Sequence, residues 1–306
     1  MTREMGVIHF TPCTATTTLA SSRIARYIAD KTFALLIDNE DMAATMRNTE
    51  FDVLFVVNGP FGFCGFRDEV AQIVGNAKRL IWVQNDYALK VPSQIKQHDF
   101  EVWTTVQDVS ESALANRYIN WNQLTFYPEM WKKLRDKHQY EGLFYYGAFR
   151  QGRVKSFNRY LKSKLYPIHI STTATNKFQE AGYAEMNIKY FGPFKSPAQM
   201  GLFKSTVYVE DDHSHNQFHS MANRFYECLS AGIAIAVDRS TMWTFKKSGL
   251  KIDTRWIVDS SLTMKEFLEL CKREDVAFAQ RKLWGINHRR KLDARLLELA
   301  EENDWT

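Results

Sequence analysis

Short apolar runs rich in β-branched and aromatic residues recur along the first half of the chain. They lie at 6–10, 33–37, 52–57 and 79–84. The stretches between them, such as "LASSRIARYIAD" and "FRDEVAQIVGNA", place apolar residues three and four positions apart, which is helical spacing. This alternation predicts parallel strands joined by helices that cover both faces of one sheet.

The second half of the chain repeats the pattern. Basic and amphipathic segments, "RVKSFNRYLKSK" and "NRFYECLSAG" among them, separate another set of apolar runs. These runs lie at 142–147, 166–172, 187–192, 205–211 and 233–238. We therefore expect an α/β protein with two Rossmann-like lobes, each built on a parallel sheet.

The segment between the two series indicates where the lobes divide. Residues 120–141 are aromatic and charged without a clear strand, and the tail at 280–303 has helical spacing. We expect an N-terminal lobe at 1–135, a C-terminal lobe at 136–285 and a terminal helix at 286–306.

Composition and charge narrow the class of protein. The 306 residues are 45% hydrophobic, enough to bury the cores of two domains. The four cysteines form no CxxC pair, so neither a zinc ribbon nor a disulfide framework is indicated. No apolar run reaches the roughly 18 residues of a membrane span, and the N-terminus lacks the apolar stretch of a signal peptide. We expect a cytoplasmic protein, and the net charge of +5 weakly favours anionic partners.

A glycine-rich basic loop follows the first strand of the second series. In "GAFRQGR", Gly147 permits close backbone approach, and Arg150 and Arg153 bring positive charge to a helix N-terminus. Parallel sheets bind ligands beyond the carboxyl ends of their strands, and this combination suits a diphosphate. A basic loop on a solvated helix face is the alternative. No Walker A or GxGxxG pattern is present, which disfavours a P-loop NTPase or an ordinary dehydrogenase.

Glu227 is a carboxylate among bulky apolar residues in "ANRFYECLSAG". Asn223, Arg224 and Glu227 fall on nearly one face of the predicted helix, which ends at Gly232 before a buried strand. Glu227 there is placed to accept the two hydroxyl groups of a ribose. An ordinary ion pair between Arg224 and Glu227, at i and i+3, is the structural alternative.

"RFYECLSAGIAIAVD" and "LFYYGAFRQGR" together resemble the nucleotide-binding region of glycosyltransferases with the GT-B fold. The pattern is similar to that of group-1-like transferases, including the spore-maturation-type family, and it covers about 145–240. The resemblance implies two lobes facing a central cleft and a C-terminal helix that crosses back to the first lobe.

The same resemblance implies roles for individual residues. Glu227 would bind the donor ribose, and Arg150 and Arg153 would bind the diphosphate. Gly147, Asn223 and Arg224 are further candidate contacts to the donor. Many retaining members carry an acidic residue eight positions before the glutamate, where this chain has His219, so His219 becomes a candidate for contact with the sugar or leaving phosphate.

Histidines and carboxylates crowd the segment before this helix. The HxHxxxH spacing in "DDHSHNQFHS" also suits a metal. The resemblance implies that basic side chains neutralise the diphosphate, so we expect no required metal or cofactor besides the nucleotide-sugar, with UDP as the favoured nucleotide.

The N-terminal lobe is expected to receive the acceptor, because polar and aromatic loops follow its strands. Asp86 is the candidate base if the reaction inverts the anomeric centre; if configuration is retained, Asp86 would orient the acceptor or cap a turn. The candidate acceptor contacts are Thr14, Thr16, Asn58, Phe61, Phe63 and Asn85.

The identity of the acceptor rests on resemblance. Basic charge, small size and many aromatic and lysine residues resemble the DNA-base glycosyltransferases of T-even-type bacteriophages, which modify hydroxylated cytosines in duplex DNA. That implies a double-stranded DNA partner, a flipped base and a location in the host cytoplasm. Two alternatives stay open: a transferase acting on polysaccharide, lipid-linked glycan or protein, and a non-catalytic nucleotide or nucleic-acid binding module.

Overall fold

A computed structural model of the chain divides into two compact units. Unit 1 comprises Met1–Leu124 and Arg290–Thr306, and unit 2 comprises Thr125–Arg289. No helix in the described part of the chain is long and apolar enough to cross a membrane. The structure describes residues 4–9, 18–38, 40–58, 68–84, 91, 93–105, 112–126, 137–184, 187–194, 197–211 and 221–303.

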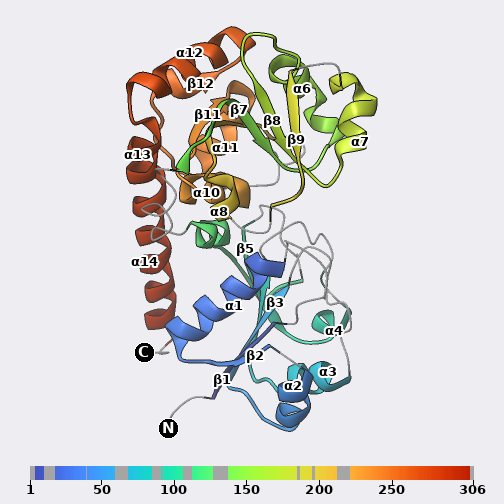
Figure 1. Ribbon diagram of the computed structural model, residues 1–306. Helices are drawn as coiled ribbons and strands as arrows, with labels where there is room; N and C mark the ends of the chain where they lie inside the picture. The colour runs from blue at the N-terminus through green and yellow to red at the C-terminus, as the bar shows by residue number, and fades with distance from the viewer. Residues whose placement is uncertain are drawn as a thin grey trace. The chain divides into compact units, whose positions relative to one another are not determined.

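Unit 1 is built on a six-stranded parallel sheet (Figure 1). Its strand order is β2-β1-β3-β4-β5-β6. Strand β2 therefore lies on one side of β1, and β3 to β6 follow in turn on the other side. The strands are β1 Met5–Ile8, β2 Leu35–Ile37, β3 Val53–Asn58, β4 Leu80–Gln84, β5 Phe100–Thr104 and β6 Ala115–Tyr118. The helices are α1 Thr18–Thr32, α2 Glu40–Met46, α3 Asp68–Gly75, α4 Ser93–Lys96, the 3-10 turn η1 Trp121–Thr125 and α14 Asn287–Glu302.

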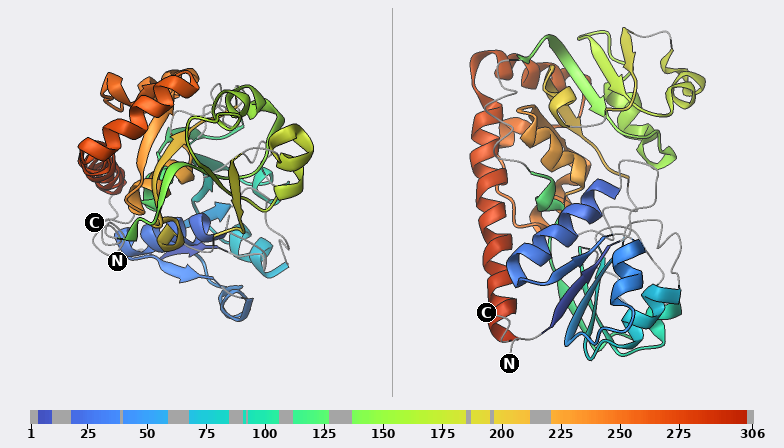
Figure 2. Two further views of the ribbon diagram at one scale, coloured as in Figure 1. Left: turned by 45° about the horizontal axis from the view of Figure 1, so that its top comes forward. Right: turned by 60° about the horizontal axis from the view of Figure 1, so that its bottom comes forward.

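Both faces of this sheet are buried, because successive side chains along each strand point to opposite sides. Phe55 packs with α1 and with the part of α14 that belongs to unit 1, whereas Leu54 and Val56 pack with α2, α3 and α4. Figure 2 shows these two layers of helices on either side of the sheet. Continuous apolar strands such as "LIWVQ" are the expected consequence of burial on two sides.

Unit 2 holds a second six-stranded parallel sheet, in the order β12-β11-β10-β7-β8-β9. Its strands are β7 Tyr140–Tyr146, β8 Ile168–Ser171, β9 Ile188–Phe191, β10 Phe203–Tyr208, β11 Ala234–Asp238 and β12 Ile257–Val258. Its α-helices are α6 Val154–Tyr160, α7 Thr175–Phe178, α8 Pro197–Met200, α10 Asn223–Ser230, α11 Met242–Lys247, α12 Ser261–Arg273 and α13 Val276–Gln280. Its 3-10 helices are η4 Gln151–Arg153, η6 Arg239–Thr241 and η7 Thr254–Trp256, and its π-helices are η5 Gln179–Tyr183 and η8 Arg281–Ile286.

Aromatic side chains dominate the core of unit 2. Tyr145 of β7 meets Phe157 of α6 edge-on, with ring centroids 5.0 Å apart. Phe225 of α10 packs against Tyr208 of β10 at 5.4 Å and against Trp284 of η8 at 5.1 Å. These contacts fix α6 and α10 against the sheet; α10 carries residues predicted to bind the donor, and Arg153 directly precedes α6.

Nine of the twelve strands coincide with the apolar runs in the sequence, so the predicted α/β architecture is confirmed. β5, β6 and β12 were not predicted. β5 contains the charged Glu101, which interrupts its apolar run, and β6 alternates between half-buried and exposed residues. The predicted terminal helical tail is present as η8 followed by α14, which belongs to unit 1 from Arg290 on.

Candidate functional site

The strand order of unit 2 marks one place where a ligand is expected. β7 and β10 are neighbours, and the chain winds from β7 towards β8 and β9 on one side and from β10 towards β11 and β12 on the other. Ligands of doubly wound sheets bind beyond the carboxyl ends of the strands at such a point. Arg150 and Arg153 follow β7, and Glu210 and Asp211 follow β10, so the loops at this point are rich in charge.

Two arginines hold the two oxygens of one buried carboxylate. Arg153 donates from Nη2 to Oε2 of Glu210, and Arg224 donates from Nη2 to Oε1. The Arg153 and Glu210 side chains are only 5% and 6% exposed, and that of Arg224 is 13% exposed. Arg153 also donates from Nη1 to the hydroxyl of Tyr145, at 3.3 Å. The three ionised groups therefore form one buried network.

The pKa of each partner reflects this pairing. Burial alone would raise the pKa of Glu210, but the positive charges of Arg224 and Arg153 outweigh it and lower the pKa. Burial alone would lower the pKa of Arg153, but Tyr145 and Glu210 outweigh it and raise the pKa. Glu210 is thus an anion and Arg153 a cation throughout the neutral pH range.

Aromatic rings and a backbone carbonyl fix the second arginine. Arg224 donates from Nη2 to the carbonyl oxygen of Val209, and its guanidinium carbon lies 5.1 Å from the centroid of the Tyr208 ring. The Tyr208 hydroxyl accepts from the backbone N–H of Ala222, the residue before α10, at 2.8 Å. The start of α10 is therefore tied to the end of β10.

Arg150 is the accessible cation of the group. Its side chain is 57% exposed, and its Nη1 lies 3.5 Å from Oδ2 of Asp211. The same Oδ2 lies 3.7 Å from Arg153 Nη2. A Cβ atom on Gly152 would lie 2.7 Å from Cβ of Asp211, so only glycine allows η4 to approach Asp211 this closely. These three guanidinium groups and two carboxylates together carry one net positive charge.

The backbone after β7 also requires glycine. Gly147 has φ of +143°, and a Cβ there would lie 3.3 Å from both Arg224 Nη1 and the Tyr145 hydroxyl. A side chain at position 147 would therefore press on the arginine network and strain the backbone.

The polar stripe predicted on α10 is present. Asn223, Arg224 and Glu227 are half-buried, whereas the other five residues of the helix are buried. The carboxylate that accepts from Arg224 Nη2 belongs to Glu210. Within the described part of the chain, Oδ1 of Asn223 is buried and has no hydrogen-bond donor. Such an atom is suited to a ligand that brings a donor.

Most predicted acceptor contacts lie outside the described residues. Asn58 is the last residue of β3. The candidates outside the described residues are Thr14, Thr16, Phe61, Phe63, Asn85, Asp86 and His219. Among the described residues, no group of three or more histidine, cysteine or acidic side chains is arranged to hold a metal ion.

Sequence reasoning identified the arginines but not their partners. Asp211 lies in the acidic and histidine-rich segment before α10, and Glu210 directly precedes that segment. The available signal was their position directly after a buried strand. Their pairing with Arg153, 57 and 58 positions earlier in the chain, depends on β7 and β10 lying side by side.

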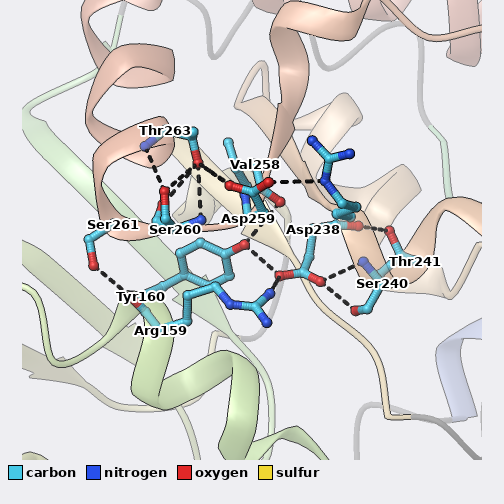
Figure 3. A network of polar contacts seen from close by, with 11 residues as sticks. Arg159, Tyr160, Asp238, Ser240, Thr241, Val258, Asp259, Ser260, Ser261 and Thr263 are labelled. Atoms are coloured by element: carbon cyan, nitrogen blue, oxygen red, sulfur yellow. Dashed lines mark hydrogen bonds and ion pairs between the residues drawn. The ribbon is translucent and has the colours of Figure 1, made fainter.

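A second buried carboxylate lies one strand away, at the end of β11 (Figure 3). Asp238 accepts from Arg159 Nη1 at 2.7 Å and from the Tyr160 hydroxyl through Oδ2, and from the Ser240 N–H at 2.8 Å and the Ser240 hydroxyl through Oδ1. Burial and the negative charge of Asp238 raise the pKa of Tyr160, so its hydroxyl keeps its proton. The Tyr160 hydroxyl also lies 3.1 Å from the carbonyl oxygen of Val258 in β12.

No protein-family model and no curated protein sequence matches this chain. Solved structures do. T4 phage β-glucosyltransferase in complex with UDP-glucose is similar at a TM-score of 0.64, with 13% identity over 99% of this chain and 97% of that one. An α-glucosyltransferase in complex with UDP and a 13-mer DNA containing an HMU base has a TM-score of 0.52 and 11% identity, over 100% and 99% of the two chains. AviGT4, a glycosyltransferase involved in avilamycin A biosynthesis, has a TM-score of 0.53 and 9% identity, over 97% and 96%.

These likenesses run along nearly the whole of each chain, so both units, and not only one, correspond to the compared proteins. The chain has the two-lobe α/β fold of these glycosyltransferases, the GT-B fold that its sequence predicts.

Proposed function

We propose that this protein is a glycosyltransferase that moves a sugar from a UDP-sugar to a hydroxyl group of modified duplex DNA. The observation that carries the proposal is the arginine cluster after β7 and β10, in which three guanidinium groups and two carboxylates carry one net positive charge. A fold shared with a UDP-glucose-bound glucosyltransferase supports the same conclusion.

In this proposal the arginines bind the donor diphosphate. Arg150 is exposed and contacts it directly, Arg224, whose side chain is 13% exposed, is the second contact, and the buried Arg153 adds positive charge. Departure of the diphosphate places negative charge on its oxygens in the transition state, and preorganised cations stabilise that charge. Gly147 lets the backbone approach the donor.

The stripe of α10 binds the nucleoside. Glu227 accepts from the ribose hydroxyl groups, and Asn223, whose Oδ1 lies buried beside it on the helix, is the second polar contact. Arg224 lies between the two, which joins the ribose and diphosphate subsites on one helix face.

Unit 1 supplies the acceptor site. T4 phage β-glucosyltransferase is a DNA modifying enzyme, and the compared α-glucosyltransferase was crystallised with DNA containing an HMU base. We assign acceptor contact to Thr14, Thr16, Asn58, Phe61, Phe63 and Asn85. Asp86 is the candidate base, and His219 the candidate contact to the donor sugar.

We assign no step of the proposed transfer reaction to a divalent metal. One structure of the T4 phage enzyme contains UDP and Mn²⁺. The described carboxylates at this edge do not suit such an ion, because both oxygens of Glu210 accept from arginines and Asp211 lies within 3.7 Å of two guanidinium groups. The chemistry is therefore assigned to the arginines.

The test of this function is release of UDP from UDP-glucose in the presence of duplex DNA. We expect release with DNA that contains hydroxymethylated pyrimidines, none with unmodified DNA, and its loss in Glu227→Ala. UDP at 100 times its dissociation constant should stabilise the folded protein by about 2.7 kcal/mol, which a thermal shift detects. Glu269→Gln, a surface change beside Lys272, is the matched control.

Two results would contradict the proposal at different points. Absence of stabilisation by UDP, GDP and their sugars would overturn the glycosyltransferase function. Stabilisation by UDP with no transfer to hydroxymethylated DNA would support the donor site and contradict the DNA acceptor. The acceptor would then belong to another class of molecule, as the likeness to an enzyme of avilamycin A biosynthesis allows.

A further inference from the structure

Glu210 is a carboxylate at the centre of an arginine cluster that is proposed to bind an anionic ligand. A carboxylate beside a diphosphate repels it unless the carboxylate is neutralised. Both oxygens of Glu210 accept from guanidinium groups, and its side chain is 6% exposed. Its charge is therefore directed inward at Arg153 and Arg224.

Arg224 has a defined orientation because several groups hold it. Glu210 Oε1 and the Val209 carbonyl oxygen both accept from Nη2, and the ring of Tyr208 lies under the guanidinium at 5.1 Å. The Tyr145 hydroxyl lies 3.5 Å from Nη1. A free arginine loses much rotamer entropy when it binds a ligand, and an arginine held in advance has already lost it.

Arg153 balances the charge that this arrangement requires. Glu210 and Arg224 alone would sum to zero and offer a diphosphate no net attraction. The buried Arg153 restores one positive charge to the three groups. Because Arg153 is only 5% exposed, it acts through this balance and not as an accessible hydrogen-bond donor.

We propose that Glu210 is a positioning residue that orients Arg224, with Arg153 as its counter-charge, for the diphosphate of the donor. This inference rests on the proposed nucleotide-sugar function and adds a residue that contacts no part of the donor. It separates the cluster into one contact (Arg224), one orienting group (Glu210) and one compensating charge (Arg153).

The experiment compares uridine with UDP by isothermal titration calorimetry, on the wild type and on Glu210→Gln. The two ligands share the nucleoside and differ in the diphosphate. We expect Glu210→Gln to weaken UDP binding about 10- to 100-fold, the size of effect that loss of a partner orienting a ligating side chain has at metal sites, and to change uridine binding less than about twofold. General damage to the fold would weaken both ligands alike, and that result would overturn the proposal, as would unchanged UDP affinity.

Further variants keep the proposal testable if Glu210→Gln folds poorly. Glu210→Asp keeps the charge but is too short to span both guanidinium groups, and we expect it to recover part of the lost UDP affinity. In an Arg224→Lys background, removal of Glu210 should cost much less UDP affinity than in the wild type, because the group it orients is gone. Equal costs in both backgrounds would overturn the proposal.

The wild-type titration separates the two levels of inference. Wild-type protein that binds neither uridine nor UDP would overturn the proposed function. Wild-type protein that binds UDP while Glu210→Gln binds it equally well would overturn only the role of Glu210. Glu269→Gln, which removes an exposed carboxylate from the same unit, should match the wild type for both ligands.

Discussion

Two buried carboxylates end neighbouring strands of unit 2 and have different surroundings. Glu210 follows β10 and is shared by two arginines, whereas Asp238 ends β11 and pairs with one arginine, one tyrosine and one serine. The first group has a surplus of positive charge, and the second is neutral overall. Burial of a carboxylate at the ligand-binding edge of a sheet therefore does not by itself mark a functional site.

The difference lies in what remains available to a ligand. Each oxygen of Asp238, at the end of β11, already accepts two hydrogen bonds. Its partners belong to α6 and η6, and β12 is joined through Tyr160 (Figure 3). That network is complete within the protein and holds four elements together. The Glu210 group instead has two arginines for one carboxylate, and Asp211 links it to the exposed Arg150. We expect the first group to govern stability and the second to govern donor binding.

The largest expected effect is on stability at Asp238. Asp238→Ala removes one partner of a buried pair and should lower the free energy of unfolding by about 3–5 kcal/mol. Urea denaturation measures this change. UDP affinity of the folded variant, titrated well below its melting temperature, should match the wild type. Loss of UDP affinity without loss of stability would reverse the roles assigned to the two carboxylates.

Arg150→Ala should lower turnover and leave stability nearly unchanged, the opposite of Asp238→Ala. Because the Arg150 side chain is 57% exposed, we expect stability to change by less than about 0.5 kcal/mol. Turnover should fall by about 100- to 1,000-fold, since removal of one preorganised electrostatic contact typically costs ~3–4 kcal/mol in the transition state. Steady-state kinetics with UDP-glucose measures it. Arg255→Ala, a surface arginine of unit 2 that pairs with Asp253 and Glu274, is the control, and an equal loss of turnover there would refute the assignment.

The smallest effect is the pH dependence that Glu210 adds. Its pKa is lowered from the usual 4.5 in the folded protein, so its contribution to stability is fully present above about pH 4.5 and is lost as the pH falls through the lowered value. One proton changes the free energy of unfolding by at most about 1.4 kcal/mol per pH unit. Denaturation at a series of acidic pH values should show a shallower fall in Glu210→Gln than in the wild type. An identical fall would indicate that Glu210 does not gain stability from its arginines.

Local sequence determined most of the architecture. Runs such as "DVLFVV" and "IAIAVD" are apolar on both faces, and only strands covered by helices on two sides are stable with such a pattern. The polar stripe of α10 followed in the same way from helical spacing. β5 was missed because Glu101 interrupts it, and the structure pairs that carboxylate with Arg79, at 2.6 Å, on the neighbouring β4 side.

The pattern of residues thus determined the two α/β lobes, the glycine-rich basic loop after β7 and the amphipathic face that carries Glu227. Only the tertiary structure decided how the charges are distributed among partners. Arg150 and Arg153 are three residues apart and equivalent in sequence, yet one is exposed and the other is buried against Glu210. The physical reason is that strand order sets ion pairing: β7 and β10 lie side by side although about 60 residues separate them, and no local pattern encodes that neighbour.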